Sequence, residues 1–173
     1  ERFGWAVAID GDSVVVGAYG DDDNGVFGLG SAYIFRTSDG GATYGQVVKL
    51  TAADAALHDS FGYSVAITGV TVVVGAYGGN VDEGSAYVFR TTDGGATYDQ
   101  VAKLTAADVA AYYWFGVSVA IEGDIIVVGT YYGEAYVFRT DDGGATYHKV
   151  AKLTPRDGNA QDNFGIYVAI DGG

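Results

Sequence analysis

The dipeptide Phe-Gly opens the same stretch of sequence four times along the chain, at Phe3, Phe61, Phe115 and Phe164. In the first three copies it leads into alternating small and β-branched residues, and then into a run of the Val-Val-Val-Gly-Ala-Tyr type. A unit that recurs about every fifty residues indicates an array or a propeller of supersecondary units. This repeat limits the possible folds more than any other feature of the chain.

Each full repeat divides into four predicted strands. The Phe-Gly segment is the first strand, with small side chains on one face as expected for the innermost strand of a blade, and the Val-rich run is the second. The third strand is expected at 31–36, 85–90 and 133–139, and the fourth at 44–50, 98–104 and 147–153. Asp-Gly-Gly turns, which supply the positive φ that tight hairpins need, join the third strand to the fourth in every copy.

Four antiparallel strands joined by short turns, repeated without helical periodicity, predict an all-β fold of the β-propeller type. The expected blades are 3–60, 61–114 and 115–163, and 164–173 would supply the first strand of a fourth. We expect these blades to form one propeller domain over 1–173. Closed propellers have typically 4–8 blades, and the chain contains no Met. We therefore expect an excerpt from a longer propeller or a processed chain.

Composition argues against several functions. The formal net charge of −13 opposes binding to nucleic acid, whose phosphates require Lys and Arg. No apolar run approaches the ~20 residues of a membrane-spanning helix, so membrane insertion is not expected. The lack of Cys removes disulfides and thiolate metal sites. Gly-x-Ser-x-Gly, zinc-ligand and phosphate-loop motifs are also missing, and we expect no enzymatic activity.

The paired Phe-Gly and Gly-Ala-Tyr signatures resemble the FG-GAP repeat family, which includes the propellers of integrin α-chains. Segments of the Lys-Leu-Thr-Ala-Ala-Asp type, at 49–54 and 103–108, are similar to those of secreted or surface FG-GAP proteins of microbes. The resemblance covers essentially the whole chain. It implies a β-propeller, with seven blades in the complete protein, and an extracellular or cell-surface location. It does not name a function, because propellers carry many unrelated ones.

Calcium-binding members of the family have a long Asp-rich loop between the first two strands of a blade. In this chain the connections at 10–13 and 68–71 are too short and too poor in oxygen ligands for the 6–8 that calcium prefers. The sharpest acidic cluster lies elsewhere, at Asp21, Asp22, Asp23 and Asn24. Alternate residues of an extended loop point the same way, so Asp21 and Asp23 could bind one calcium ion. A solvated Asx-rich turn is the alternative.

The loops that follow the second and fourth strands vary in length and carry most of the acidic residues, whereas the other turns hardly vary. The two sets lie at opposite ends of an antiparallel blade, and variable loops on a constant scaffold usually hold the binding site. Several aromatic residues on or beside the variable end occur in only one repeat, so the scaffold does not require them. Together with one acid, they form the predicted ligand-binding set: Trp5, Phe27, Tyr63, Tyr112, Tyr113, Trp114, Tyr132 and Glu134.

Two other sets of residues recur in all three repeats. Tyrosines at equivalent positions, such as Tyr19, Tyr77 and Tyr131, are expected to pack between blades, where rings are buried in quantity. A lysine in each fourth strand (Lys49, Lys103 and Lys152) is expected to protect an exposed sheet edge from further strand pairing. Both sets are therefore interpreted as parts of the scaffold.

Rings beside carboxylates suit the stacking and hydrogen bonding of sugars, and Trp and Tyr are also enriched at the centres of protein interfaces. A third interpretation is that these rings only cover the edge of the next blade. We expect a non-enzymatic recognition or adhesion module that binds a glycan or a protein through the acidic, aromatic end. The alternative is a structural protein whose open blade edges pack between chains into a filament or matrix.

Overall fold

The computed structural model describes residues 2–22, 27–78, 83–108, 113–157 and 162–171. These residues form twelve strands and no helix, arranged as three four-stranded antiparallel sheets in which sequence neighbours pair. Blade 1 holds β1 (Ala6–Asp10), β2 (Ser13–Ala18), β3 (Ser31–Arg36) and β4 (Gly45–Leu50); blade 2 holds β5 (Phe61–Thr68), β6 (Thr71–Ala76), β7 (Ser85–Arg90) and β8 (Asp99–Leu104); blade 3 holds β9 (Ser118–Glu122), β10 (Ile125–Gly129), β11 (Ala135–Arg139) and β12 (His148–Leu153). The prediction of an all-β fold with four-stranded blades is confirmed.

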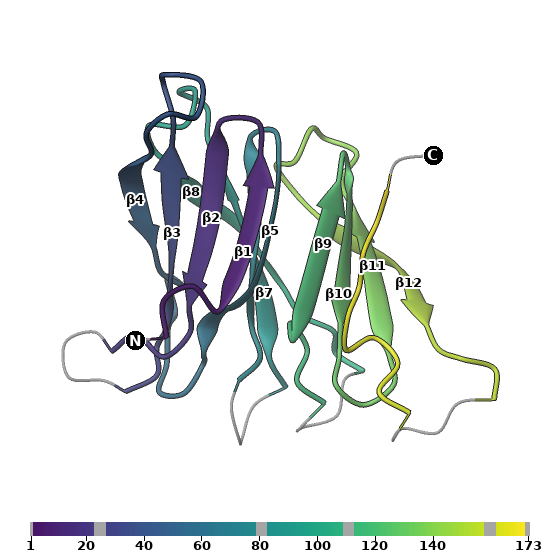
Figure 1. Cartoon of the computed structure of the whole chain (residues 1–173). Helices are drawn as coiled ribbons and strands as arrows, with labels where there is room; N and C mark the ends of the chain where they lie inside the picture. The colour runs from purple at the N-terminus through teal and green to yellow at the C-terminus, as the bar shows by residue number, and fades with distance from the viewer. Residues whose placement is uncertain (1, 23–26, 79–82, 109–112, 158–161, 172–173) are drawn as a thin grey trace.

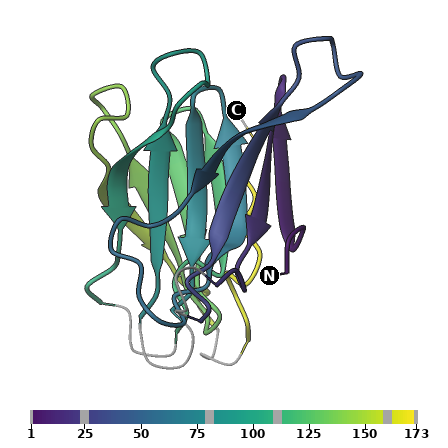
Figure 2. The same cartoon turned by 90° about the vertical axis from the view of Figure 1, so that its left-hand side faces the viewer.

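The three sheets stand side by side in an open arc, which is a partial propeller (Figures 1 and 2). The first strands of the blades are in contact with one another, β1 with β5 and β5 with β9, so they line the inner side of the arc. In Figure 1 the turns joining β1 to β2 and β3 to β4 lie at the top, and the connection from β2 to β3 lies at the bottom. We call the bottom the loop end of the propeller, because the variable loops gather there.

Two apolar cores lie between the blades rather than within them. One core joins blades 1 and 2, and the other joins blades 2 and 3. The inner strand β5 contributes to both: Val65 and Ile67 face blade 1, whereas Ala66 faces blade 3. Ser64 also faces blade 3, since its hydroxyl donates a hydrogen bond of 2.8 Å to the carbonyl oxygen of Gly116. The small residue Ser64 therefore allows the backbone of the next blade to approach closely.

Each Phe-Gly pair sits in the same tight turn. The residue before the Phe has a positive φ in all four copies, with values of 53° at Arg2, 57° at Ser60, 55° at Trp114 and 55° at Asn163. The glycine that follows the Phe also has a φ in the left-handed region, for example 91° at Gly116. Residues 164–171 repeat the turn, and the amide of Ile166 donates to the carbonyl of Asn163 at 3.2 Å. They form no strand, but they lie against blade 3, where the hydroxyl of Ser118 donates a hydrogen bond to the carbonyl oxygen of Gly165 at 2.8 Å.

Each Asp-Gly-Gly turn is held by one carboxylate. Asp93 accepts hydrogen bonds from the Thr97 hydroxyl at 2.7 Å, the Thr97 amide at 3.0 Å and the Thr91 hydroxyl at 2.8 Å. Asp39 and Asp142 repeat this pattern in the other two blades. These donors, the Thr97 hydroxyl first, hold the pKa of Asp93 well below its usual range.

The turns predict how stability depends on pH. The folded pKa of each of the three turn aspartates is depressed, so the unfolded chain takes up protons first as the pH falls. We therefore expect the free energy of unfolding to be highest above about pH 4 and to decrease steadily below it. Urea unfolding should be measured at about pH 6 and about pH 3. Between these two pH values the free energy of unfolding should decrease less for Asp93→Asn than for the wild type. Equal losses would show that the turn carboxylate does not contribute.

Candidate aromatic binding site

A continuous row of aromatic rings crosses all three blades at the loop end. Its members come from two positions in each blade, one at the Phe-Gly turn and one just after the second strand. We call it the aromatic row, and it consists of Trp5, Tyr19, Tyr63, Tyr77, Trp114, Tyr131, Tyr132 and Tyr113. Because the second strand runs antiparallel to the first, its end returns to the Phe-Gly turn and brings the two positions together.

Ring contacts link consecutive members of the row without a break. The ring centroids lie 5.0 Å apart for Trp5 and Tyr19, and 5.1 Å apart for Tyr19 and Tyr63. The next pairs, Tyr63 with Tyr77 and Tyr77 with Trp114, lie at 4.5 Å and 5.6 Å. Trp114 then contacts Tyr131 at 4.8 Å. Most of these pairs are T-shaped, an arrangement that aromatic quadrupoles favour.

The recurring tyrosines fall into two sets that differ in burial. Tyr19, Tyr77 and Tyr131 were expected to pack between blades, and Tyr19 does contact Tyr63 of the next blade. All three are nevertheless only partly buried and lie among the rings that occur once. The expectation holds for Tyr87 and Tyr136, which are almost completely buried in the cores between blades. The difference follows from position, since Tyr87 and Tyr136 lie inside their strands while the other set lies beyond a strand end.

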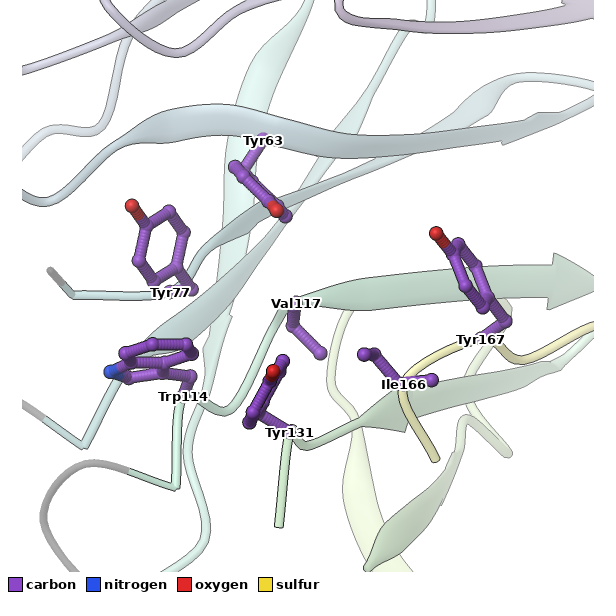
Figure 3. Close-up of a pocket in the computed structure, with 7 residues that line it drawn as sticks. All are labelled: Tyr63, Tyr77, Trp114, Val117, Tyr131, Ile166 and Tyr167. Atoms are coloured by element: carbon purple, nitrogen blue, oxygen red, sulfur yellow. The ribbon is translucent and has the colours of Figure 1, made fainter. Parts of the chain in front are cut away.

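A hollow of about 120 Å³ opens within the row, between blades 2 and 3 and the Phe-Gly segment that follows them. Figure 3 shows the side chains around it, which are Tyr63, Tyr77, Trp114, Val117, Tyr131, Ile166 and Tyr167. Val117 and Ile166 occupy the position that Trp5 and Tyr63 hold in the first two copies. Because these aliphatic side chains are smaller than rings, they leave space beside Trp114 and Tyr131. Tyr167, with 89% of its surface exposed, stands at the open side.

The hollow includes a phenol that can donate a hydrogen bond. Burial, and then the neighbouring phenols of Tyr77 and Tyr19, raise the pKa of Tyr63, so its hydroxyl keeps its proton. The indole Nε1 of Trp114 is buried and has no hydrogen-bond partner among the described residues. Trp114 also adopts a φ of 55°, which a bulky side chain rarely does. The same φ occurs at Arg2, Ser60 and Asn163, so it is a property of the repeated turn, and only the large side chain is particular to Trp114.

The structure places the predicted ligand-binding residues in three groups. Trp5, Tyr63, Tyr113, Trp114 and Tyr132 belong to the row. Phe27 is exposed and makes no ring contact with the described residues, and Glu134 lies in an ion pair away from the hollow. Tyr112 lies outside the described residues. The sequence interpretation missed Tyr19, Tyr77, Tyr131, Val117, Ile166 and Tyr167, although the pairing of the first two strands would have placed the residues after the Val-rich run beside the Phe-Gly turn.

A family model of the FG-GAP repeat matches residues 1–35, 44–89, 98–148 and 147–173. The chain belongs to the FG-GAP repeat family. The resemblance seen in the Phe-Gly and Gly-Ala-Tyr signatures is thereby confirmed. No curated protein matches the chain.

A solved structure supports the fold of this FG-GAP chain. The crystal structure of Saccharomyces cerevisiae Sqt1 is similar, with a TM-score of 0.59 over 91% of this chain. At 12% sequence identity this likeness concerns the fold alone. The match covers 37% of the Sqt1 chain, so the FG-GAP chain spans little more than a third of that length.

In this FG-GAP chain, several acids of the loop end pair with the recurring lysines. Lys49 bonds Asp21 at 3.0 Å, Lys103 bonds Asp54 at 2.6 Å, and Lys152 bonds Glu134 at 2.7 Å. Each lysine also lies over the ring of a tyrosine in the third strand of its blade, at 5.4–5.8 Å. The lysines do lie on outer strands as expected, but they join the outer strands to the loops as well. The negative charge of this end is therefore partly neutralised.

Two of the four residues in the acidic cluster at 21–24, Asp21 and Asp22, make hydrogen bonds within the fold. Burial alone would raise the pKa of Asp21, but hydrogen bonds from Lys49, Tyr33 and Ser31 lower it. Asp22 accepts a hydrogen bond of 2.8 Å from the amide of Gly28. Asp23 and Asn24 lie outside the described residues, so calcium binding by this cluster stays a prediction. Among the described residues, no group of three His, Cys, Asp or Glu side chains could hold a metal ion.

The described part of this FG-GAP chain contains no helix that is long and apolar enough to cross a membrane.

Proposed function

We propose that this FG-GAP chain is a non-enzymatic recognition or adhesion module of the extracellular space or cell surface, which binds a glycan or a protein through the aromatic row. The hollow between blades 2 and 3 carries the proposal. It combines rings that can stack on a ligand with phenol groups that can donate hydrogen bonds. It also lies at the end of the blades where the loops vary, which is where propeller-like scaffolds place binding residues.

Trp114 is the residue on which binding is expected to depend most. The equivalent residues of the other copies are Arg2, Ser60 and Asn163, so the turn itself does not need a ring. Trp114 has the strained φ of this turn and contacts Tyr77, Tyr131 and Tyr132. A large side chain placed where the backbone favours a small polar one indicates a role in recognition.

The test is a glycan array followed by titration of a bound glycan against Trp114→Asn. Asn is the natural residue at 163, where it adopts the same φ of 55°, so the turn should be preserved. We expect a loss of about 2 kcal/mol, which is ~30-fold in Kd. Val70→Ser, an exposed position in the turn between β5 and β6 at the opposite end, should bind as the wild type does. A bound glycan insensitive to Trp114→Asn would contradict the proposed site.

One observation favours the structural alternative. Val7 and Ile9 of β1 are 60% and 63% exposed, and Phe3 beside them is 56% exposed. Their counterparts Val65 and Ile67 in β5 pack in the core between blades 1 and 2. Self-association through this face would support a filament or matrix role. Sedimentation velocity would detect it, and Ile9→Lys should abolish it.

A further inference from the structure

The side chains of this chain that lose an electron most readily are concentrated in the aromatic row. The chain has no Cys and no Met, which are the usual first targets of oxidants. It has two Trp residues, and both belong to the row. Each Trp is in ring contact with a tyrosine, Trp5 with Tyr19 at 5.0 Å and Trp114 with Tyr131 at 4.8 Å. An electron lost from either Trp can therefore be replaced from an adjacent phenol.

Tyr63 and Tyr132 each have tyrosine neighbours on both sides in the row, and the contact of Tyr63 with Tyr77 is the shortest between two described tyrosines. The ring centroid of Tyr63 lies 4.5 Å from that of Tyr77 and 5.1 Å from that of Tyr19. Both pairs are T-shaped, with interplanar angles of 65° and 67°, so one ring of each pair presents its edge to the other. The carbons next to the phenol oxygen, where tyrosyl radicals couple, lie on the ring edge. The aromatic χ2 angle is soft, which allows the small rotation that would bring two such edges together.

We propose that Tyr63 is a site of oxidative cross-linking, which forms a dityrosine with Tyr19 or Tyr77 under a one-electron oxidant. Each of the two tyrosines loses one electron and its phenol proton, giving two phenoxyl radicals. The radicals join through one new carbon–carbon bond between ring carbons ortho to oxygen. The hydrogens on those two carbons then move to the oxygens and restore both phenols. The net loss of two electrons and two protons is balanced when one hydrogen peroxide, used by a peroxidase, becomes two water molecules.

The bond to Tyr19 would have a structural consequence. Tyr19 directly follows β2 of blade 1, whereas Tyr63 belongs to β5 of blade 2. A link between them would join two blades covalently in a chain that has no cysteine for a disulfide. This inference does not depend on ligand binding by the row.

The experiment uses the purified chain, illuminated with a ruthenium tris-bipyridyl photo-oxidant and persulfate. We expect dityrosine fluorescence in the monomer fraction, and mass spectrometry should find a cross-linked peptide pair containing Tyr63. Tyr63→Phe should lose this cross-link, and so should the double variant Tyr19→Phe, Tyr77→Phe, which keeps Tyr63 but removes both partners. Phe retains the ring packing in each case. Tyr44→Phe removes an exposed tyrosine outside the row and should leave the cross-link unchanged.

Two results would overturn the proposal. One is an undiminished monomer signal in both Tyr63→Phe and the double variant. The other is dityrosine found only between molecules, in covalent dimers. Circular dichroism of each variant establishes that a lost signal reflects the missing phenol and not a lost fold.

Discussion

Replacement of Gly75 by Ala is expected to destabilise the propeller by about 3 kcal/mol, because it separates blades 2 and 3. Gly75 lies in β6, and a Cβ at this position would collide with the carbonyl oxygen of Gly116 and the hydroxyl of Ser64. The first of these is backbone in the next blade and cannot rotate away. The added methyl would also break the hydrogen bond from Ser64 to Gly116. Urea unfolding monitored by Trp fluorescence measures the effect.

Gly45→Ala is the matched control for Gly75→Ala. Gly45 also lies in a strand, β4, but no atom lies within 4 Å of the point that a Cβ would occupy, and its φ is not in the left-handed region. Since Ala restricts the unfolded chain, this variant should be neutral or more stable by about 0.5 kcal/mol. A similar loss in both variants would mean that the glycine's flexibility, and not the close approach of the blades, decides stability.

Phe115→Ala should cost about 4 kcal/mol, whereas Phe3→Ala should cost about 1 kcal/mol. The two residues hold the same place in their repeats. Phe115 lies 5.5 Å from Tyr136 and 6.1 Å from Phe138, and Phe3 lies at the same two distances from Tyr33 and Phe35. They differ in coverage, since Phe115 is fully buried and Phe3 is 56% exposed.

The comparison of these two variants therefore isolates the contribution of the neighbouring blade. Phe115 is covered by blade 2, to which it is joined by a bridge at Gly84. Differential scanning calorimetry of both variants would give the two losses directly. Equal losses of stability would show that the Phe of the repeat is stabilised by its own blade. The contact with the neighbouring blade would then contribute little to stability.

Much of the fold could be predicted because the responsible interactions are local and repeated. The alternation of small and β-branched residues in 61–67 and the Val-rich run at 72–74 predicted two adjacent strands. The Asp-Gly-Gly turns predicted the hairpins that join the third strands to the fourth. The boundaries were less accurate. The fourth strands begin at Gly45, Asp99 and His148, one residue later than expected, and the third strand of blade 3 begins at Ala135 instead of 133. At that point Glu134 is still part of a turn, where its carbonyl accepts from the amide of Thr130.

The candidate site could be predicted only in part. Trp5, Tyr63, Tyr113, Trp114 and Tyr132 were recognised because each breaks the repeat. Tyr19, Tyr77 and Tyr131 were assigned to packing between blades, and their partial exposure beside the site was not predicted, because a residue that recurs is easily taken for scaffold alone. The assignment of Glu134 to the ligand stays a prediction, and the structure places this residue in an ion pair with Lys152. Recurrence identifies equivalent positions, but it does not tell which of them face solvent.

The sequence by itself determined the strands, the turns, the number of blades and the family, because each depends on residues close together in the chain and on their repetition. The tertiary structure decided which surfaces are covered. Phe3 and Phe115 are identical in local sequence role, and only the presence of blade 2 beside Phe115 buries it. The hollow beside Trp114 likewise exists because Val117 and Ile166 come together from two repeats. Burial and cavity shape depend on the packing of neighbouring blades, whose residues lie about fifty positions apart in the chain.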